Sequence, residues 1–281
     1  MDTQSTERQE QPGTQQSVAT SATPSMYPTV SVVIPALNEA DNLPYVLDRI
    51  PEWVHEVLLV DGHSIDGTLT VTCTLRPHAR IVEQRGRGKG AALRNGFAAA
   101  TGDIIVMLDA DGSTRPEEIP AYVGALLAGA DYAKGSRFLQ GGGTDDMPFY
   151  RRLGNWGFVT MVRILFGGKF SDLLYGYNAF WARVLPDLYL DGEGFEIETM
   201  MNIRALRAGL KIAEVPSFEA ERIHGEGRLR TFPDGWRVLM TVFRERLGIR
   251  RERSGSQTGT FDPKEDTGEE LSCPVILGDE E

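Results

Sequence analysis

The stretch that most constrains the fold of this chain is an apolar run from Ile104 to Leu108 that ends in two carboxylates, Asp109 and Asp111. The run is continuously apolar, partly β-branched, and bounded by a glycine and an Asp-Gly turn pair, which predicts a central strand buried on both faces. In open α/β sheets ligands bind at the carboxyl ends of strands, where two carboxylates one residue apart can hold a hard divalent cation. Asp109 and Asp111 are therefore the predicted metal ligands. The alternative is that Asp111 only forms a turn and that Asp109 caps a helix starting at Pro116.

The acidity of the chain lies mostly in its two ends. The net charge is −11. Residues 251–281 hold nine acidic residues against three basic ones, and residues 1–28 hold three against one, which leaves about −3 for the body. Both ends have few large apolar side chains to offset the entropy of ordering, so both are predicted to be disordered tails. Residues 29–250 are predicted to form a single domain with halves at 29–115 and 116–250.

The sequence excludes several classes of protein. No stretch reaches the roughly 18 apolar residues of a membrane span, and the amino terminus lacks the basic and apolar regions of a signal peptide. Basic residues occur in short groups rather than as a stripe with stacking aromatics, which predicts no nucleic-acid partner. Cys73 and Cys273 are too few and too far apart in the sequence to predict a disulfide framework or a zinc site. These features favour a reduced, cytoplasmic protein whose contact with a membrane, if it has one, is peripheral.

Strands alternate with helices in the first half of the domain. The strands are predicted at 30–34, 55–60, 79–83 and 104–108. The helices between them are predicted at 41–50, 68–75 and 91–100. This alternation predicts a mostly parallel sheet with helices packed on its faces. The second half is less regular. Its helices are predicted at 116–128, 148–166, 196–208 and 233–247, its strands at 131–134, 177–181 and 211–215, and an extended segment at 218–223.

Polar side chains follow the predicted strands and converge on one edge of the sheet if these strands are parallel. They are Asn38, Glu39, Asp61, Arg87, Lys89, Asp109 and Asp111. Carboxylates alone would repel a phosphate, so Lys89 and a cation would neutralise a diphosphate there, whereas Glu39 and Asp61 could accept hydrogen bonds from a base and a ribose. The glycine-rich loop Gly86–Gly90 resembles a phosphate-binding loop, although its spacing matches neither G-x-G-x-x-G nor a P-loop.

Four motifs in the first half stand in a characteristic order and spacing. They are Val33-Ile-Pro-Ala-Leu-Asn-Glu39, Val60-Asp-Gly-His-Ser-Ile-Asp-Gly-Thr68, Gly88-Lys-Gly-Ala-Ala-Leu-Arg-Asn-Gly96 and Leu108-Asp-Ala-Asp-Gly-Ser113. Together they resemble a family-2 inverting glycosyltransferase with a GT-A fold. The second half is most similar to the dolichyl or polyprenyl-phosphate mannosyltransferase branch, through Gly135-Ser-Arg137, Asp172–Phe180, Glu214-Val-Pro216 and Glu221–Arg228. The resemblance implies a Rossmann-like α/β domain, with the nucleotide bound by its first half and the acceptor by its second.

The resemblance also implies the residues of the site. Nucleotide-sugar binding is expected at Pro35, Ala36, Leu37, Glu39, Asp61, Lys89, Asp109, Ala110, Asp111 and Arg222. Mg²⁺ or Mn²⁺ is expected on Asp109 and Asp111. Binding of the acceptor's phosphate is expected at Arg137 with Arg151 or Arg152, and His224 is added because its loop also carries Arg222 and Arg228.

This sequence departs from the family pattern at three places. Gly62 and His63 stand where a second aspartate is common, Asn178 stands where a basic residue is usual, and Gly227 replaces a serine. The first departure weakens base recognition by the loop after the second strand. The other two weaken the assignment to the mannosyltransferase branch rather than to the family.

The acceptor decides whether the predicted reaction needs a base. A lipid phosphate monoester is already largely anionic at neutral pH, because its second pKa is about 6, whereas a sugar hydroxyl needs a carboxylate to take its proton. Arginines suit the first acceptor. Glu196 and Glu198 are the candidate catalytic bases for the second, although two acids in the first turn of a helix also complement its dipole.

The predicted function is a metal-dependent transfer of a hexose from a nucleotide sugar, of the GDP-mannose or UDP-glucose type, to polyprenyl or dolichyl phosphate. The apolar stripe at 158–166 could lie in the membrane interface, and its alternative role is core packing. The alternative functions are transfer to a saccharide or small soluble acceptor, including one of the glucosyl-phosphoglycerate type, and non-catalytic binding of a nucleotide sugar. The sequence leaves open the sugar, the nucleotide and the oligomeric state, including a homo-oligomer.

Overall fold

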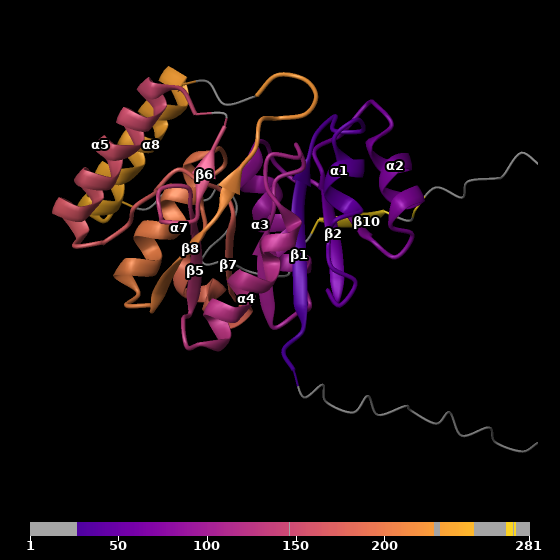
Figure 1. Cartoon of the computed structure of the whole chain (residues 1–281), viewed down its shortest axis with the longest axis horizontal. Helices are drawn as coiled ribbons and strands as arrows, with labels where there is room; N and C mark the ends of the chain where they lie inside the picture. Colours follow the sequence, from indigo (N-terminus) through magenta and orange to yellow (C-terminus); the bar gives the residue numbers. More distant parts are fainter. Residues whose placement is uncertain (1–26, 146, 228–230, 250–267, 272, 274–281) are drawn as a thin grey trace, which may run out of the picture.

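An eight-stranded sheet forms the centre of the molecule in the computed structural model, which describes residues 27–145, 147–227, 231–249, 268–271 and 273 (Figure 1). The strand order is β10-β3-β2-β1-β4-β7-β5-β8. The strands are β1 (Val30–Ala36), β2 (Glu56–Asp61), β3 (Arg80–Glu83), β4 (Ile104–Met107), β5 (Tyr132–Ser136), β7 (Asn178–Trp181), β8 (Ile212–Pro216) and β10 (Glu269–Leu271). A separate pair joins β6 (Gly143–Thr144) to β9 (Phe218–Glu219).

Helices cover both faces of the sheet. One face is covered by α1 (Leu43–Leu47), α2 (Thr68–Leu75), the 3₁₀ turn η1 (Pro116–Glu118) and α4 (Ile119–Leu127). The opposite face is covered by α3 (Lys89–Ala99), η2 (Ala182–Val184), α6 (Leu185–Leu188) and α7 (Glu196–Arg207). Beyond α7 lie α5 (Phe149–Phe166) and α8 (Thr231–Leu247), side by side at one end of the molecule (Figure 1). The predicted α/β class, a mostly parallel sheet flanked by helices, is confirmed.

β4 is the central strand that its sequence predicts. Ile104 and Val106 belong to the apolar cluster on one face of the sheet, and Ile105 and Met107 belong to the cluster on the other. All four side chains are buried. β4 pairs in parallel with β1 and antiparallel with β7, so the carboxylates that follow it lie at the carboxyl edge of the parallel strands.

The end of the chain differs from its predicted disorder. β10 pairs antiparallel with β3 at the edge of the sheet, and Arg80 on β3 forms an ion pair with Glu270. Cys73 on α2 and Cys273 form a disulfide across 200 residues of sequence, a pair that their number and spacing did not predict and that contradicts the expectation of a reduced protein. The two cysteines can pair despite their distance in sequence, because β10 brings Cys273 close to α2. Unpaired cysteines therefore no longer argue for a cytoplasmic location, which stays a prediction.

The predicted tail residues 1–26, 251–267, 272 and 274–281 lie outside the described residues. Within the described residues, no helix combines the length and the apolar content needed to cross a membrane.

Candidate functional site

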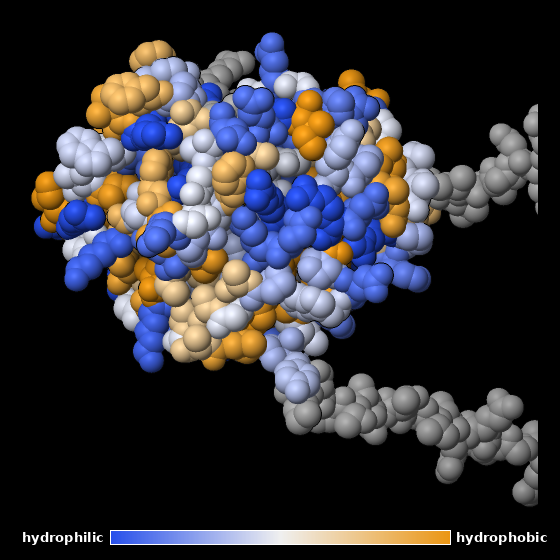
Figure 2. All heavy atoms as spheres, viewed as in Figure 1, coloured by the Kyte–Doolittle hydropathy of each residue, from blue (hydrophilic) through white to orange (hydrophobic). Residues whose placement is uncertain are grey.

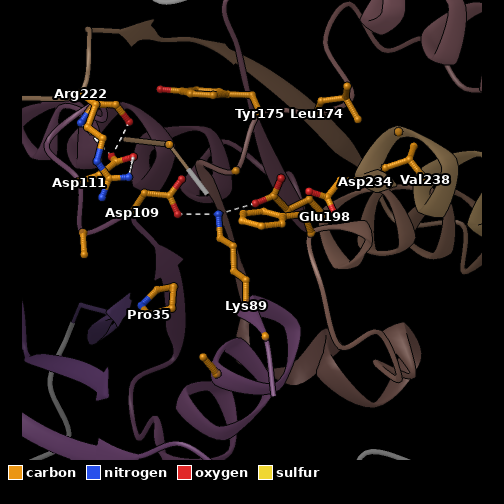
Figure 3. Close-up of a pocket in the computed structure, with 18 of the residues that line it drawn as sticks. Pro35, Lys89, Asp109, Asp111, Leu174, Tyr175, Glu198, Arg222, Asp234 and Val238 are labelled. Carbon is orange, nitrogen blue, oxygen red and sulfur yellow. Dashed lines mark hydrogen bonds and ion pairs between the residues drawn. The ribbon is translucent and has the colours of Figure 1, made fainter. Parts of the chain in front are cut away.

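A cavity of about 970 Å³ opens at the carboxyl edge of the parallel strands, and residues of α5 and α8 close its far side (Figure 3). It brings together most of the predicted site residues: Pro35, Ala36, Leu37, Glu39, Lys89, Asp109, Ala110, Asp111, Arg137, Arg151, Glu198 and Arg222. Four predicted residues do not line this cavity: Asp61, Arg152, Glu196 and His224. Arg228 lies outside the described residues.

Lys89 bridges two carboxylates at the centre of the cavity (Figure 3). Its Nζ lies 2.5 Å from Asp109 Oδ1 and 2.6 Å from Glu198 Oε1. Burial alone would lower the pKa of Lys89, but the charges of Asp109 and Glu198 outweigh it and raise that pKa. Lys89 is therefore charged, and it holds the loop after β4 and the start of α7 together.

Glu198 is the more buried carboxylate of this triad. Its side chain is 7% exposed. Burial raises its pKa, and Asp109 adds to the increase, while Lys89 opposes it. One ammonium is shared by two carboxylates, so the triad carries an excess negative charge, which makes Glu198 a stronger base than an exposed glutamate.

Asp111 lies on the other side of Asp109, under the loop that carries Arg222. Ser113 donates to its Oδ1 from its amide at 3.1 Å and from its hydroxyl at 2.7 Å. Arg222 Nη1 lies 3.7 Å from Asp111 Oδ2 and also pairs with Glu39. Burial raises the pKa of Asp111, and the negative charge of Asp109 raises it further.

The two aspartates fit the predicted divalent cation. The two carboxylates repel each other, and this repulsion contributes to the raised pKa of Asp111. A bound cation would reduce the repulsion. No cluster of three His, Cys, Asp or Glu side chains suited to a metal occurs in the part of the chain that the structure describes. The protein would therefore supply two carboxylates, and the remaining positions would be open to oxygens of a diphosphate.

The glycine-rich loop differs from the predicted phosphate cradle. The first amides of α3 are bonded to the protein, since Gly90 N donates to Glu193 O at 2.8 Å and Ala91 N to the same oxygen at 3.4 Å. A Cβ on Gly88 or Gly90 would collide with the backbone of residues 192–194. These glycines therefore allow the start of α3 to approach the segment before α7, which brings Lys89 to Glu198.

Arg137 is held by two carboxylates. Its Nε and Nη2 donate to Asp172 at 2.7 and 2.9 Å, and its Nη1 donates to Glu219 at 2.9 Å. The Asp172 side chain has no exposed surface. Arg137 therefore has a structural ion pair. Its contact with an acceptor stays a prediction. The same holds for Arg151, which also lines the cavity.

The four predicted residues outside the cavity have local partners. Asp61 accepts from the amides of His63 and Ser64 at 3.1 Å or slightly more. Glu196 accepts from the amide of Gly194 at 3.2 Å at the start of α7 and lines a smaller neighbouring cavity. The backbone of His224 bonds to the Asn42 side chain, and the Arg152 guanidinium lies 5.9 Å from the Phe138 ring centroid.

The sequence did not indicate the residues of the far wall. They include Tyr150, Asn155, Phe158, Tyr175, Trp236, Val238 and Leu239. The helical spacing of apolar residues predicts α5 and α8, but it carries no information on what each face contacts. Only the packing of α5, α7 and α8 around a third apolar cluster turns these side chains toward the cavity.

A buried lysine lies beside Asn178, which stands where the resembled family usually has a basic residue. β5 and β7 pair Lys134 directly with Asn178, so both side chains are on the same face of the sheet. Lys134 is fully buried, and its Nζ donates to the carbonyl of Tyr175 at 2.7 Å. Burial lowers the pKa of Lys134 to about 8, although Asp172 opposes the change.

Lys134 is expected to make folding stability rise with pH above pH 8. Between about pH 8 and 10 the lysine is protonated in the unfolded chain and neutral in the folded one, so stability gains up to about 1.4 kcal/mol per pH unit. Urea denaturation at about pH 7, 8.5 and 9.5 measures the gain. The rise should be absent in Lys134→Met and present in Lys211→Met, a change at an exposed position. Parallel pH profiles for wild type and Lys134→Met would contradict the prediction.

Comparisons with known sequences point to one family. The profile of the family described as Glycosyl transferase family 2 matches residues 31–185. An undecaprenyl-phosphate mannosyltransferase from Micrococcus luteus is 34% identical over 214 residues, which are 71% of this chain and 87% of that protein. A dolichol-phosphate mannosyltransferase from Pyrococcus furiosus is 33% identical over 210 residues, 72% of this chain but only 59% of that protein.

Solved structures give a similar result. Glucosyl-3-phosphoglycerate synthase from Mycobacterium tuberculosis, in complex with Mn²⁺, UDP and glucosyl-3-phosphoglycerate, has a TM-score of 0.63 and 27% identity, and the match covers 81% of this chain and 82% of that one. The same enzyme with Mg²⁺ and UDP has a TM-score of 0.62, with the same identity and coverage. Both neighbours were solved with a divalent cation and a nucleoside diphosphate.

Proposed function

This chain belongs to glycosyl transferase family 2, and we propose that it transfers a hexose from a GDP- or UDP-sugar to polyprenyl phosphate with the help of Mg²⁺ or Mn²⁺. The observation that carries the proposal is a single cavity with two chemically different ends. The acidic pair Asp109 and Asp111, with Lys89, lies at the sheet edge, whereas arginine and apolar side chains line the opposite end.

The sheet end suits a nucleotide sugar. A divalent cation bound by Asp109 and Asp111 would neutralise the negative charge that develops on the leaving diphosphate. Lys89 and Arg222 add positive charge on either side of the aspartates. The side chains of Lys89 and Arg222 both have carboxylates of the protein as partners, so they are held in position before any substrate binds.

The opposite end suits a phosphate attached to an apolar chain. Arg151 lies there with apolar side chains from α5 and α8, among them Phe158, Val238 and Leu239. A phosphate monoester brings its own nucleophilic oxygen, so the attack on the anomeric carbon needs no protein base. The mannosyltransferases from Micrococcus and Pyrococcus carry lipid phosphates in their names, which supports this acceptor.

The outer surface of α5 and α8 suits a membrane interface. Exposed apolar side chains that do not line the cavity recur along both helices: Phe149, Leu153, Trp156 and Ile164 on α5, and Phe243 and Leu247 on α8. Figure 2 shows hydrophobic groups interspersed with hydrophilic ones at this end of the molecule. Such helices bind in the interface through apolar area and through attraction to anionic lipids.

A second candidate function is transfer to a small soluble acceptor. Glu198 favours it, because a buried carboxylate with a raised pKa inside the cavity could take the proton of an acceptor hydroxyl. The likeness to glucosyl-3-phosphoglycerate synthase also supports it.

Transfer assays distinguish the two functions. The full chain is incubated with Mn²⁺ and labelled GDP-mannose or UDP-glucose, together with either polyprenyl phosphate in vesicles or 3-phosphoglycerate in water. We expect label in the organic phase only with polyprenyl phosphate. Label only in a water-soluble product would favour the second function, and no transfer to either acceptor would contradict the proposal.

Two surface variants test the membrane contact in the same assay. Leu153 is 55% exposed on α5 and does not line the cavity. Leu153→Glu is expected to reduce transfer to vesicle-bound acceptor about 10-fold while preserving nucleotide binding, because it places a charge on the apolar face. Ile65→Glu is the matched control, since Ile65 is 93% exposed in the loop before α2, at the other end of the molecule (Figure 1).

A further inference from the structure

Gln84 occupies the space next to Gly62, which together with His63 stands where the resembled family commonly has a second aspartate. The parallel pairing of β2 and β3 sets Asp61 opposite Glu83, so Gly62 and Gln84 are the next residues on neighbouring strands. Gln84 N donates to Asp61 O at 2.9 Å. A Cβ on Gly62 would lie 3.0 Å from Gln84 Oε1. The glycine therefore makes room for the carboxamide of Gln84.

The hydrogen bonds of Gln84 determine which of its polar atoms is available. Its Nε2 donates to the carbonyl of Gly88 at 3.1 Å and to that of Gly86 at 3.4 Å. Two carbonyls on one side orient the amide nitrogen toward them, so Oε1 points toward Gly62. Within the described residues no donor is bonded to Oε1, and Gln84, only 9% exposed, lines the cavity.

The neighbouring aspartate is already engaged. Both carboxylate oxygens of Asp61 accept amides of its own loop, from His63 and Ser64, and Asp61 does not line the cavity. Pro35 and Leu37 provide an apolar wall in the same cavity, and Leu37 Cβ, like Gln84 Oε1, lies within 3.3 Å of a Cβ built on Gly62. A planar base stacked on this wall would meet the carboxamide oxygen of Gln84, a hydrogen-bond acceptor.

We propose that Gln84 Oε1 recognises the nucleobase of the donor by accepting a hydrogen bond from its ring N–H, which is N3–H of uracil or N1–H of guanine. This inference rests on the proposed function. Adenine and cytosine present an unprotonated ring nitrogen at the corresponding position, which would face the carboxamide oxygen with a lone pair. Gln84, which follows the adjacent strand β3, would thus supply the acceptor beside Gly62, which has no side chain of its own.

A double-mutant cycle between protein and ligand tests this assignment. Calorimetry with Mn²⁺ measures the Kd of UDP, N3-methyl-UDP, GDP and N1-methyl-GDP for wild type and Gln84→Met. Wild type is expected to bind each methylated nucleotide about 10- to 100-fold more weakly than its parent, because Oε1 loses its donor. Gln84→Met is expected to bind the parent nucleotides more weakly by a similar factor and to show little further loss on methylation.

The cycle separates base reading from a structural role. If Gln84 only holds the loop at Gly86 and Gly88, Gln84→Met weakens all four nucleotides equally, and equal discrimination by the two proteins overturns this inference alone. His78→Ala, a change at an exposed position that does not line the cavity, should keep wild-type discrimination. If wild type binds neither UDP nor GDP, the proposed function fails and this inference with it.

Discussion

Asp111→Asn is expected to lower the rate of sugar transfer by at least about 10³-fold, which corresponds to about 4 kcal/mol of lost stabilisation of the departing diphosphate. Asparagine keeps the shape of the side chain but removes one of the two negative charges offered to the cation. Initial rates at saturating donor over a Mn²⁺ titration measure the loss. Asp187→Asn, at an exposed position on α6, is the control and should have wild-type activity.

Unfolding would not explain that loss. Asp111 lies in a buried site where Asp109 already disfavours its charge, so the neutral variant should be at least as stable as wild type in thermal denaturation. An Asp111→Asn protein that retains full activity would show that the carboxylate pair does not hold a catalytic cation.

Arg137→Met is expected to reduce the free energy of unfolding by about 3–5 kcal/mol, because it leaves a buried carboxylate without its partner. Asp172 has no exposed side-chain surface and receives two guanidinium hydrogen bonds. Burial alone would raise the pKa of Asp172, but Arg137 outweighs burial and lowers it. Urea denaturation near neutral pH measures the change.

An exposed ion pair provides the matched control. Arg49 also makes two contacts with one carboxylate, that of Glu117, but the two side chains are 38% and 53% exposed. Arg49→Met is therefore expected to cost less than about 1 kcal/mol. Equal losses of unfolding free energy in the two variants would mean that the Arg137 ion pair contributes no more to stability than a surface ion pair. Asp172→Asn in the Arg137→Met background should recover part of the loss, because it removes the unpaired charge.

Local patterns in the sequence predicted those elements whose hydrogen bonds and burial are themselves local. The helix predicted at 68–75 has the observed bounds of α2, and the apolar run before Asp109 is β4. The same patterns missed two strands. β6 is short and follows a glycine-rich segment, and β10 lies in an acidic stretch without a strand-like apolar pattern.

The sequence by itself determined the α/β class, the family and the acids at the end of β4, because strand and helix periods and the order of the motifs can be read along one stretch of chain. The tertiary structure alone decided the partners of those residues. Lys89 meets Glu198 across 109 positions, and Arg137 meets Glu219 across 82. The physical reason is that the charge of a buried side chain is balanced by an oppositely charged group that the topology of the sheet and its helices brings within a few ångströms. The periodicity of residues along the chain contains no information about which group that is.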